Sequence, residues 1–122
     1  MCKKRISVKS AKAKGRKLQN LTAKKISELL DIPYGKDTLI FPRPMGQSGT
    51  DVGLIGESLE RFQYAIECKN AERWNFPMWI EQAKSNQSEE TDWLLVVGKN
   101  NYKPIVVMDM NAFFDLCEKA KL

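Results

Sequence analysis

The spacing of apolar residues predicts three helices in this chain. Over residues 15–30 the apolar side chains recur at helical intervals, and Asp31 and Pro33 follow the predicted end. A second helix is expected over residues 78–85, and a third after Asn111, whose side chain would cap it. The residues that carry these patterns are Leu18, Leu21, Ile26, Leu29 and Leu30, then Trp79, Ile80 and Ala83, then Phe113, Phe114 and Leu116.

Strand patterns occupy the intervals between the predicted helices. Residues 42–49 and the GESLER segment at 56–61 are predicted as a loop and a turn from their composition. The resulting order α-β-β-β-α-β-β-α predicts an α/β fold with a central mixed β-sheet flanked by helices. Short strands are expected over residues 38–41, 51–55, 62–69 and 104–108, and a fully buried strand over 93–98.

The charge of the chain is divided between a basic leader and an acidic body. The 122 residues carry a net charge of +5, from 20 Lys and Arg against 15 Asp and Glu. Residues 1–25 hold ten of the basic residues and no acid, so the rest of the chain is net acidic. We expect residues 1–13 to form a disordered leader and residues 14–122 to form a single domain. Such a leader is attracted to polyanions such as nucleic acids, although it could also be a solvated tail.

The composition excludes several classes of site. The chain has no histidine, which rules out Ser-His-Asp and Cys-His nucleophilic sites and histidine metal ligands. Cys2, Cys68 and Cys117 fit neither a disulfide framework nor a zinc-ligand spacing, and they favour a reducing, cytoplasmic location. No apolar run approaches the ~18 residues of a membrane span. An enzyme of this composition would have to use carboxylates, lysine and a hard metal ion, or a cofactor.

The end of the predicted strand over residues 62–69 brings an acid and a base together. Side chains alternate between the two faces of a strand. Glu67 and Lys69 therefore share one face, and Ile66 and Cys68 share the opposite, apolar face.

An aspartate on the preceding strand would meet this pair. If strands 51–55 and 62–69 form a hairpin, Asp51 lies diagonal to Glu67, with ~7–8 Å between the backbones. Two converging carboxylates repel each other unless a proton or a cation lies between them. Mg²⁺ or Mn²⁺ would suit this position because both accept oxygen ligands. The backbone carbonyl of Cys68 would be well placed as a third ligand.

Phosphodiester hydrolysis is the chemistry that such a site would support. A bound metal ion lowers the pKa of its water and neutralises charge on the phosphate. Lys69 would orient the attacking water or neutralise the scissile phosphate. The alternative is a surface hairpin in which Glu67 and Lys69 form an ion pair worth under ~1 kcal/mol.

These residues resemble the PD-(D/E)xK nuclease superfamily. Asp51 matches its first acid, and Glu67-Cys68-Lys69 matches its (D/E)xK triplet. The likeness is strongest to small Holliday-junction-resolvase-like and phage-type endonucleases, and it spans about residues 12–115. It implies a restriction-endonuclease-like core and a Mg²⁺-dependent endodeoxyribonuclease. Further matching positions are Lys12, Gly15 and Arg16, then Ser48, Gly49 and Thr50, then Ile66, then Glu81, Gln82, Ala83 and Lys84.

The resemblance also assigns supporting roles. Gln82 would contact the metal-bound water or the phosphate. Gln19 stands where many resolvases carry a glutamate that reaches the metal, so a second metal would be held weakly. Trp74 is a candidate for DNA contact or for a dimer interface. Residues expected to contact DNA are Lys12, Lys14, Arg16, Lys17, Arg43 and Ser48.

A branched DNA such as a four-way junction is the substrate that the resemblance suggests. Two symmetric cuts need two sites, which implies a homodimer. A short nuclease with a basic leader would suit a phage within its host cell. Two other functions stay open: the same fold could bind DNA without cutting it, or the leader could dock on RNA or on an acidic protein.

Overall fold

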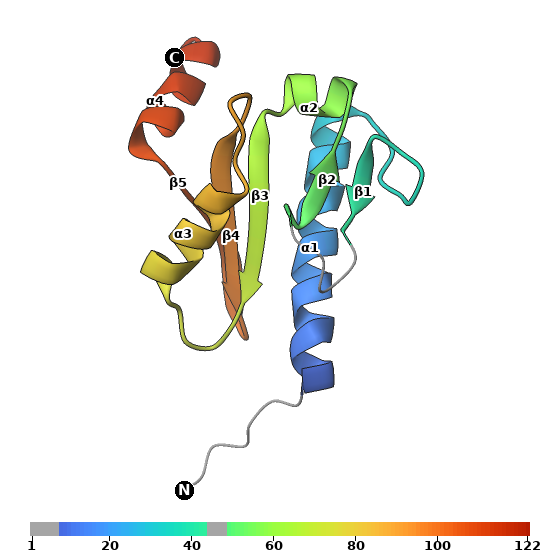
Figure 1. The fold of residues 1–122 in the computed structure, drawn as a ribbon, viewed down its shortest axis with the longest axis vertical. Helices are drawn as coiled ribbons and strands as arrows, with labels where there is room; N and C mark the ends of the chain where they lie inside the picture. Colours follow the sequence, from blue (N-terminus) through green and yellow to red (C-terminus); the bar gives the residue numbers. More distant parts are fainter. Residues whose placement is uncertain (1–7, 44–48) are drawn as a thin grey trace, which may run out of the picture.

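The computed structural model describes residues 8–43 and 49–122, and helices flank its sheets (Figure 1). A mixed three-stranded sheet forms its centre, and a two-stranded antiparallel sheet lies beside α1. The α/β fold with a mixed sheet that the sequence predicts is therefore confirmed. The elements are α1 (Val8–Leu30), β1 (Ile40–Pro42), β2 (Val52–Leu54), α2 (Glu57–Arg61), β3 (Tyr64–Asn70), α3 (Phe76–Ser85), β4 (Asp92–Lys99), β5 (Tyr102–Met108) and α4 (Met110–Lys119).

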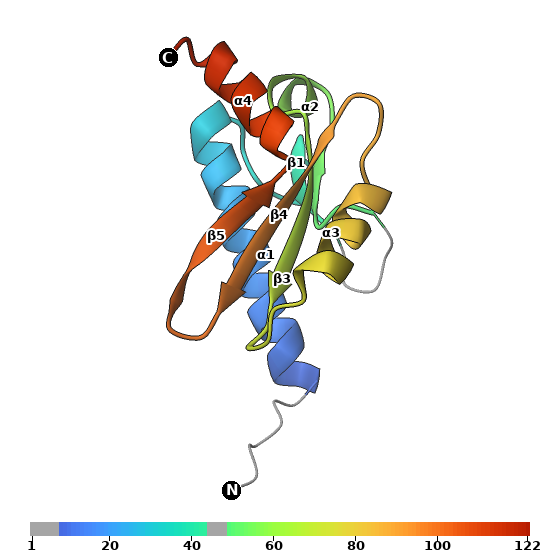
Figure 2. The same ribbon diagram turned by 90° about the vertical axis from the view of Figure 1, so that its left-hand side faces the viewer.

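The central sheet has the strand order β3-β4-β5. β3 pairs in parallel with β4, which places Glu67 opposite Leu95. A parallel pair needs a crossover connection, and α3 supplies it. β4 pairs antiparallel with β5, with Val96 opposite Val106, so β5 forms the outer edge (Figure 2).

Two apolar clusters lie on opposite faces of this sheet. On one face, α1 packs against the sheet through Leu18 and Ile26, which meet Ile66 and Val96. On the other face, α3 packs through Trp79, Ala83 and neighbouring side chains against Trp93, Leu95 and Val97. Because β4 contributes to both clusters, it is apolar on both faces, which explains its continuous apolar run. Each fully buried Leu, Ile or Val contributes about 1.5–3 kcal/mol relative to exposure.

The first helix is longer than the apolar pattern indicates. α1 begins at Val8 instead of Gly15, so residues 8–13 of the expected disordered leader are helical. Residues 9–17 contain only alanine as an apolar side chain, so the spacing of apolar residues does not show where the helix begins. Alanine, lysine and arginine have high helix propensity, which accounts for the extension. Residues 1–7 of the expected leader lie outside the described part of the chain.

The segment predicted as a GESLER turn contains the short helix α2. It follows Gly56, whose φ of 59° is in the left-handed region that favours glycine. Ser58 is fully buried, and its hydroxyl donates to the carbonyl of Leu39 at 2.7 Å. The predicted hairpin between strands 51–55 and 62–69 is wrong, because α2 separates the two strands and β2 pairs with β1.

The last helix is capped by Asp109 and not by Asn111. The carboxylate of Asp109 accepts a hydrogen bond from the backbone N–H of Ala112 at 3.0 Å. Asn111 lies inside α4. Aspartate and asparagine are both favoured at helix starts, so the sequence pattern alone does not separate them.

Candidate functional site

Asp51 lies against β3, although the predicted hairpin is absent. Its backbone N–H donates to the carbonyl of Ile66 at 2.8 Å. Its carboxylate Oδ2 accepts a hydrogen bond from the backbone N–H of Cys68 at 2.6 Å. These two bonds hold Asp51, which immediately precedes β2, beside the part of β3 that carries Glu67 and Lys69.

Glu67 is a buried carboxylate with two donors. Its side chain lies on the α3 side of the sheet, and the residue is only 4% exposed. One carboxylate oxygen lies 3.6 Å from the ammonium of Lys69. The other accepts a hydrogen bond from the side-chain amide of Asn86, at the end of α3, at 3.2 Å. The ion pair of Glu67 with Lys69 is therefore present, but it is not an exposed surface pair.

The surroundings of both carboxylates disfavour their negative charge. Burial, and next the negative charge of Asp51, raise the pKa of Glu67 to about 7, against the opposing effects of Lys69 and Asn86. Burial also raises the pKa of Asp51, while the N–H of Cys68 and the charges of Lys69 and Arg43 lower it. A cation between the carboxylates would relieve this repulsion. The site is therefore suited to a positively charged ligand.

The donor set at this position fits a hard divalent ion. The carboxylates of Asp51 and Glu67 are oxygen donors of the kind that Mg²⁺ and Mn²⁺ accept. Within residues 8–43 and 49–122, no three Cys, Asp or Glu side chains gather in a metal-binding arrangement. A bound ion would complete its coordination shell largely with water, as Mg²⁺ usually does in proteins. The Cys68 carbonyl stays a predicted third ligand.

The side chain of Cys68 takes no part in this chemistry. It packs on the opposite face of β3, against the α1 cluster, and its thiol lies 3.7 Å from the hydroxyl of Thr22. Burial raises the pKa of the thiol to about 12. Because the thiolate is the reactive form, Cys68 is not a nucleophile at neutral pH.

Gln19 supports the site through the backbone. It is buried in α1, and its side-chain amide donates to the main-chain carbonyls of Asp51 and Arg43, the latter at 3.2 Å. Gln19 thereby joins α1 to the backbone at Arg43 and at Asp51. Its predicted role as a weak metal ligand is untested, and the contacts that the structure shows are structural.

Replacement of Gln19 by methionine should destabilise the fold. The change keeps the side-chain length but leaves the carbonyls of Asp51 and Arg43 without this donor, which should cost about 1–3 kcal/mol of unfolding free energy. Urea denaturation measures the change. Lys17→Met, at an exposed position of the same helix, is the matched control. Equal stability of the two variants would show that the Gln19 contacts contribute nothing.

Asn86, the residue that caps the C-terminus of α3, contacts Glu67. Gln82 is exposed, and the hydrogen bonds at this residue use its backbone carbonyl, which accepts from Ser85 and Asn86. The predicted contact of Gln82 with the metal-bound water stays a prediction. The sequence pattern missed Asn86 because it places this residue in the loop after the helix. No local pattern signals this contact, because it joins residues 19 positions apart.

The other predicted DNA contacts are dispersed. Arg43 is tied to the chain near Asp51, since its Nε donates to the carbonyl of Thr50 at 2.7 Å. Ser48 lies outside the described residues. Trp74 is half-buried at the edge of the α3 cluster, and its ring packs against Phe76. Its indole N–H is buried without a hydrogen-bond partner in the described part of the chain.

A basic hollow lies between α1 and the ends of β3 and β4. It has a volume of about 320 Å³ and is lined by Lys14 and Lys17 of α1 and by Lys99 of β4. Asn70, which directly follows Lys69, also lines it. The ammonium of Lys99 lies 4.1 Å from the ring centroid of Tyr102. Lys12 and Arg16 are exposed on α1. The hollow thus places three cations near the strand that carries Glu67.

Two further findings bear on function. In the described part of the chain, no helix has the length and apolar character needed to cross a bilayer. In comparisons with known proteins, the chain matches no protein-family profile, no curated protein and no solved structure. The resemblance to PD-(D/E)xK nucleases therefore stays a prediction, and the functional assignment depends on the geometry above.

Proposed function

We propose that this protein is a metal-dependent DNA endonuclease of the PD-(D/E)xK type. The observation that carries the proposal is the approach of the Asp51 carboxylate to β3, the strand that carries Glu67 and Lys69, with Glu67 almost fully buried. A carboxylate whose pKa is raised by burial and by a second carboxylate is typical of functional sites. If Glu67 and Lys69 formed only a structural ion pair, a second carboxylate, that of Asp51, would not be needed beside them.

The chain's own residues would share the work of hydrolysis. Asp51 and Glu67 would hold Mg²⁺ or Mn²⁺, which supplies an activated water and neutralises charge on the phosphate. The N–H of Cys68 fixes one oxygen of Asp51, and Asn86 fixes one oxygen of Glu67. Lys69 would donate to the attacking water or to the scissile phosphate.

The order of elements supports a restriction-endonuclease-like core as the finer description of the fold. α1 precedes the strands, Asp51 directly precedes β2, and the triplet lies on β3, which α3 connects to a parallel β4. This order matches the family's helix, three strands, helix and further strand, with α2 as an insertion. The basic hollow favours a polyanionic substrate. A branched DNA is the substrate that the resemblance suggests.

A cleavage assay tests the proposal directly. Labelled four-way junction, duplex and single-stranded DNA are incubated with Mg²⁺, with Mn²⁺ or with EDTA. We expect cutting that requires the metal, and the ranking of substrates separates a resolvase from a general endonuclease. Binding without cutting in either metal would contradict the proposal.

One observation favours a DNA-binding module as the second candidate. Gln19, at the position where many resolvases carry a glutamate, donates to two backbone carbonyls. A site with only two carboxylates could bind DNA without turnover. Normal DNA affinity without cleavage in Mg²⁺ or Mn²⁺ would support this candidate. Loss of binding on deletion of residues 1–14, with no effect of Asp51→Ala or Glu67→Ala, would instead point to a leader that docks on RNA or on an acidic protein.

The basic hollow should set the salt dependence of DNA binding. If about five charges neutralise phosphates, the log-log slope of affinity against salt should be about −4 to −5. Replacement of Lys14, Lys17 and Lys99 together by glutamine should reduce its magnitude by about 2 to 3. Binding is measured by fluorescence anisotropy across a salt series. The control replaces three exposed lysines outside the hollow, Lys36, Lys119 and Lys121, and an equal effect of both triple variants would disprove the assignment.

A further inference from the structure

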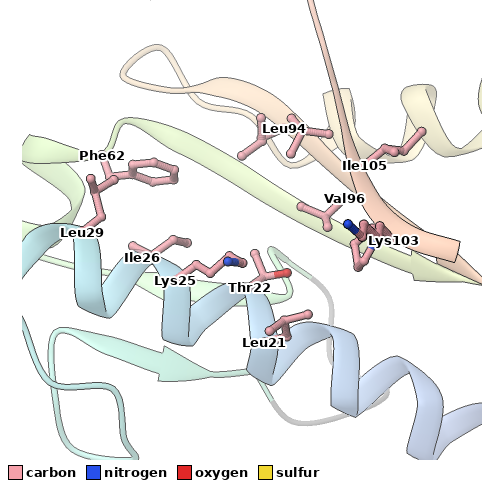
Figure 3. Close-up of a pocket in the computed structure, with 12 residues that line it drawn as sticks. Leu21, Thr22, Lys25, Ile26, Leu29, Phe62, Leu94, Val96, Lys103 and Ile105 are labelled. Atoms are coloured by element: carbon pink, nitrogen blue, oxygen red, sulfur yellow. The ribbon is translucent and has the colours of Figure 1, made fainter.

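An apolar groove lies between α1 and β5 (Figure 3). Its volume is about 530 Å³. Leu21 and Leu29 of α1 form one wall, and Val96 of β4 and Val106 of β5 line the side that faces it. Sites for small ligands usually have volumes of about 300–1,000 Å³ and a mostly apolar lining. The groove therefore has the size and the lining of a ligand site.

The groove continues into the basic hollow. Leu21 and Pro104 line both, so the two spaces adjoin. Along α1 the lining changes from Lys14 and Lys17 in the hollow to Leu21 and Leu29 in the groove, at positions three or four residues apart that share one helix face. The opposite side changes in the same direction, from the turn between β4 and β5 to the apolar residues of these strands. The groove and the hollow thus form one trough with an apolar end and a cationic end.

The lysines of this trough have no carboxylate partner in the part of the chain that the structure describes. Figure 3 shows Lys25 and Lys103 extending from opposite sides into the space between α1 and the sheet. The carboxylate of Glu72 accepts a hydrogen bond from the backbone N–H of Asn100 at 3.3 Å and is not paired with a lysine. A lysine can lay its stem along an apolar surface and keep its ammonium group free for an anion. The lysines that line the trough are Lys14, Lys17, Lys25, Lys99 and Lys103.

We propose that the trough binds a single-chain lipid with a phosphate head group, with the acyl chain in the groove and the phosphate in the hollow. Burial of the chain against aliphatic side chains would drive binding. Phosphate oxygens accept charge-assisted hydrogen bonds from ammonium groups, and the amides of Asn70 and Asn101 line the hollow as further donors. Inorganic phosphate or a DNA backbone would use the hollow but leave the groove unfilled, and a neutral lipid would leave the lysines without an anion.

Calorimetric titration of the full chain with alkyl phosphates tests both halves of the ligand. Decyl phosphate, kept below its critical micelle concentration, should bind. Octyl phosphate should bind about 10-fold more weakly, because it lacks two methylene groups that the groove would bury. Decanol and inorganic phosphate, which each carry one half of the ligand, should bind more weakly still. Absence of decyl phosphate binding, or equal affinity for decyl, octyl and inorganic phosphate, would overturn the proposal.

Two variants separate the ends of the trough. Val106→Asn places an amide in the groove and should weaken decyl phosphate binding by about 10-fold. Met78→Asn is its control, since both residues are 57% exposed and Met78 lies on α3, outside the trough. Glutamine at Lys14, Lys17 and Lys99 together should weaken binding by about 10-fold or more, whereas the same change at Lys36, Lys119 and Lys121 should not. Circular dichroism confirms that the variants fold, and wild-type affinity of Val106→Asn would contradict the groove assignment.

Methyl signals in the NMR spectrum locate the bound chain. Decyl phosphate should shift the signals of Leu21, Leu29 and Val106 and leave that of Leu54 on β2 unchanged. Shifts confined to α4, where Leu116 is 44% exposed, would show that the chain binds that helix and would overturn the proposal. These experiments contain neither DNA nor a divalent ion, so their failure would leave the proposed nuclease activity untouched.

Discussion

Glu67→Gln is expected to lower metal-dependent DNA cleavage by about 10³-fold or more, with little change in DNA affinity. The substitution keeps the shape of the side chain and its contact with Asn86, but it removes the charge that would hold the metal ion. Cleavage rates under single-turnover conditions and binding by anisotropy separate the two effects. Glu81→Gln, an exposed acid on α3, is the matched control and should cleave as the wild type does.

Asp51→Asn and Lys69→Ala complete this test of the site. Asp51→Asn should cause a loss of cleavage similar to that of Glu67→Gln, because the two carboxylates share one ion. Lys69→Ala removes the ammonium that lies 3.6 Å from Glu67 and should also abolish cleavage while largely sparing DNA binding. Wild-type cleavage by either carboxylate variant would show that the catalytic site lies elsewhere.

The candidate site was predictable from the sequence because strand alternation is local. Period-two alternation places Glu67 and Lys69 on one face and Cys68 on the other, and the structure has this arrangement. The approach of Asp51 to β3 was expected for a wrong reason. It depends on hydrogen bonds to Ile66 and Cys68 at the start of β2, and not on a hairpin.

The parts that sequence reasoning missed depend on contacts between distant segments. Gln19 meets the carbonyl of Asp51 across 32 positions, and Asn86 meets Glu67 across 19. No local pattern encodes such a meeting. The helix α2 was missed because the buried hydroxyl of Ser58, which binds the carbonyl of Leu39, stabilises a segment whose composition resembles a turn. Tertiary context overrides local propensity at these positions.

Without a divalent ion, Glu67→Gln is expected to be more stable than the wild type above pH 7. The pKa of Glu67 is raised from 4.5 to about 7, so the folded state binds the proton more tightly than the unfolded state does. The stability linked to this proton is fully present below pH ~4.5 and is lost as the pH rises through about 7. The charged form then costs about 3 kcal/mol, which the neutral glutamine avoids. Urea unfolding in EDTA should show similar stabilities at pH 5 and a clear advantage of the variant at pH 8.

Addition of Mg²⁺ at pH 8 should cancel most of this advantage of the variant. The ion binds the charged pair of Asp51 and Glu67, and at 100 times its dissociation constant it would stabilise the wild type by about 2.7 kcal/mol. Glu67→Gln should gain much less, whereas Glu81→Gln should follow the wild type at every pH. An ion pair of Glu67 with Lys69 that has only a structural role predicts a different outcome: loss of stability in Glu67→Gln at pH 8 and no response to Mg²⁺. These unfolding measurements therefore decide whether the buried carboxylate is kept for packing or for a cation.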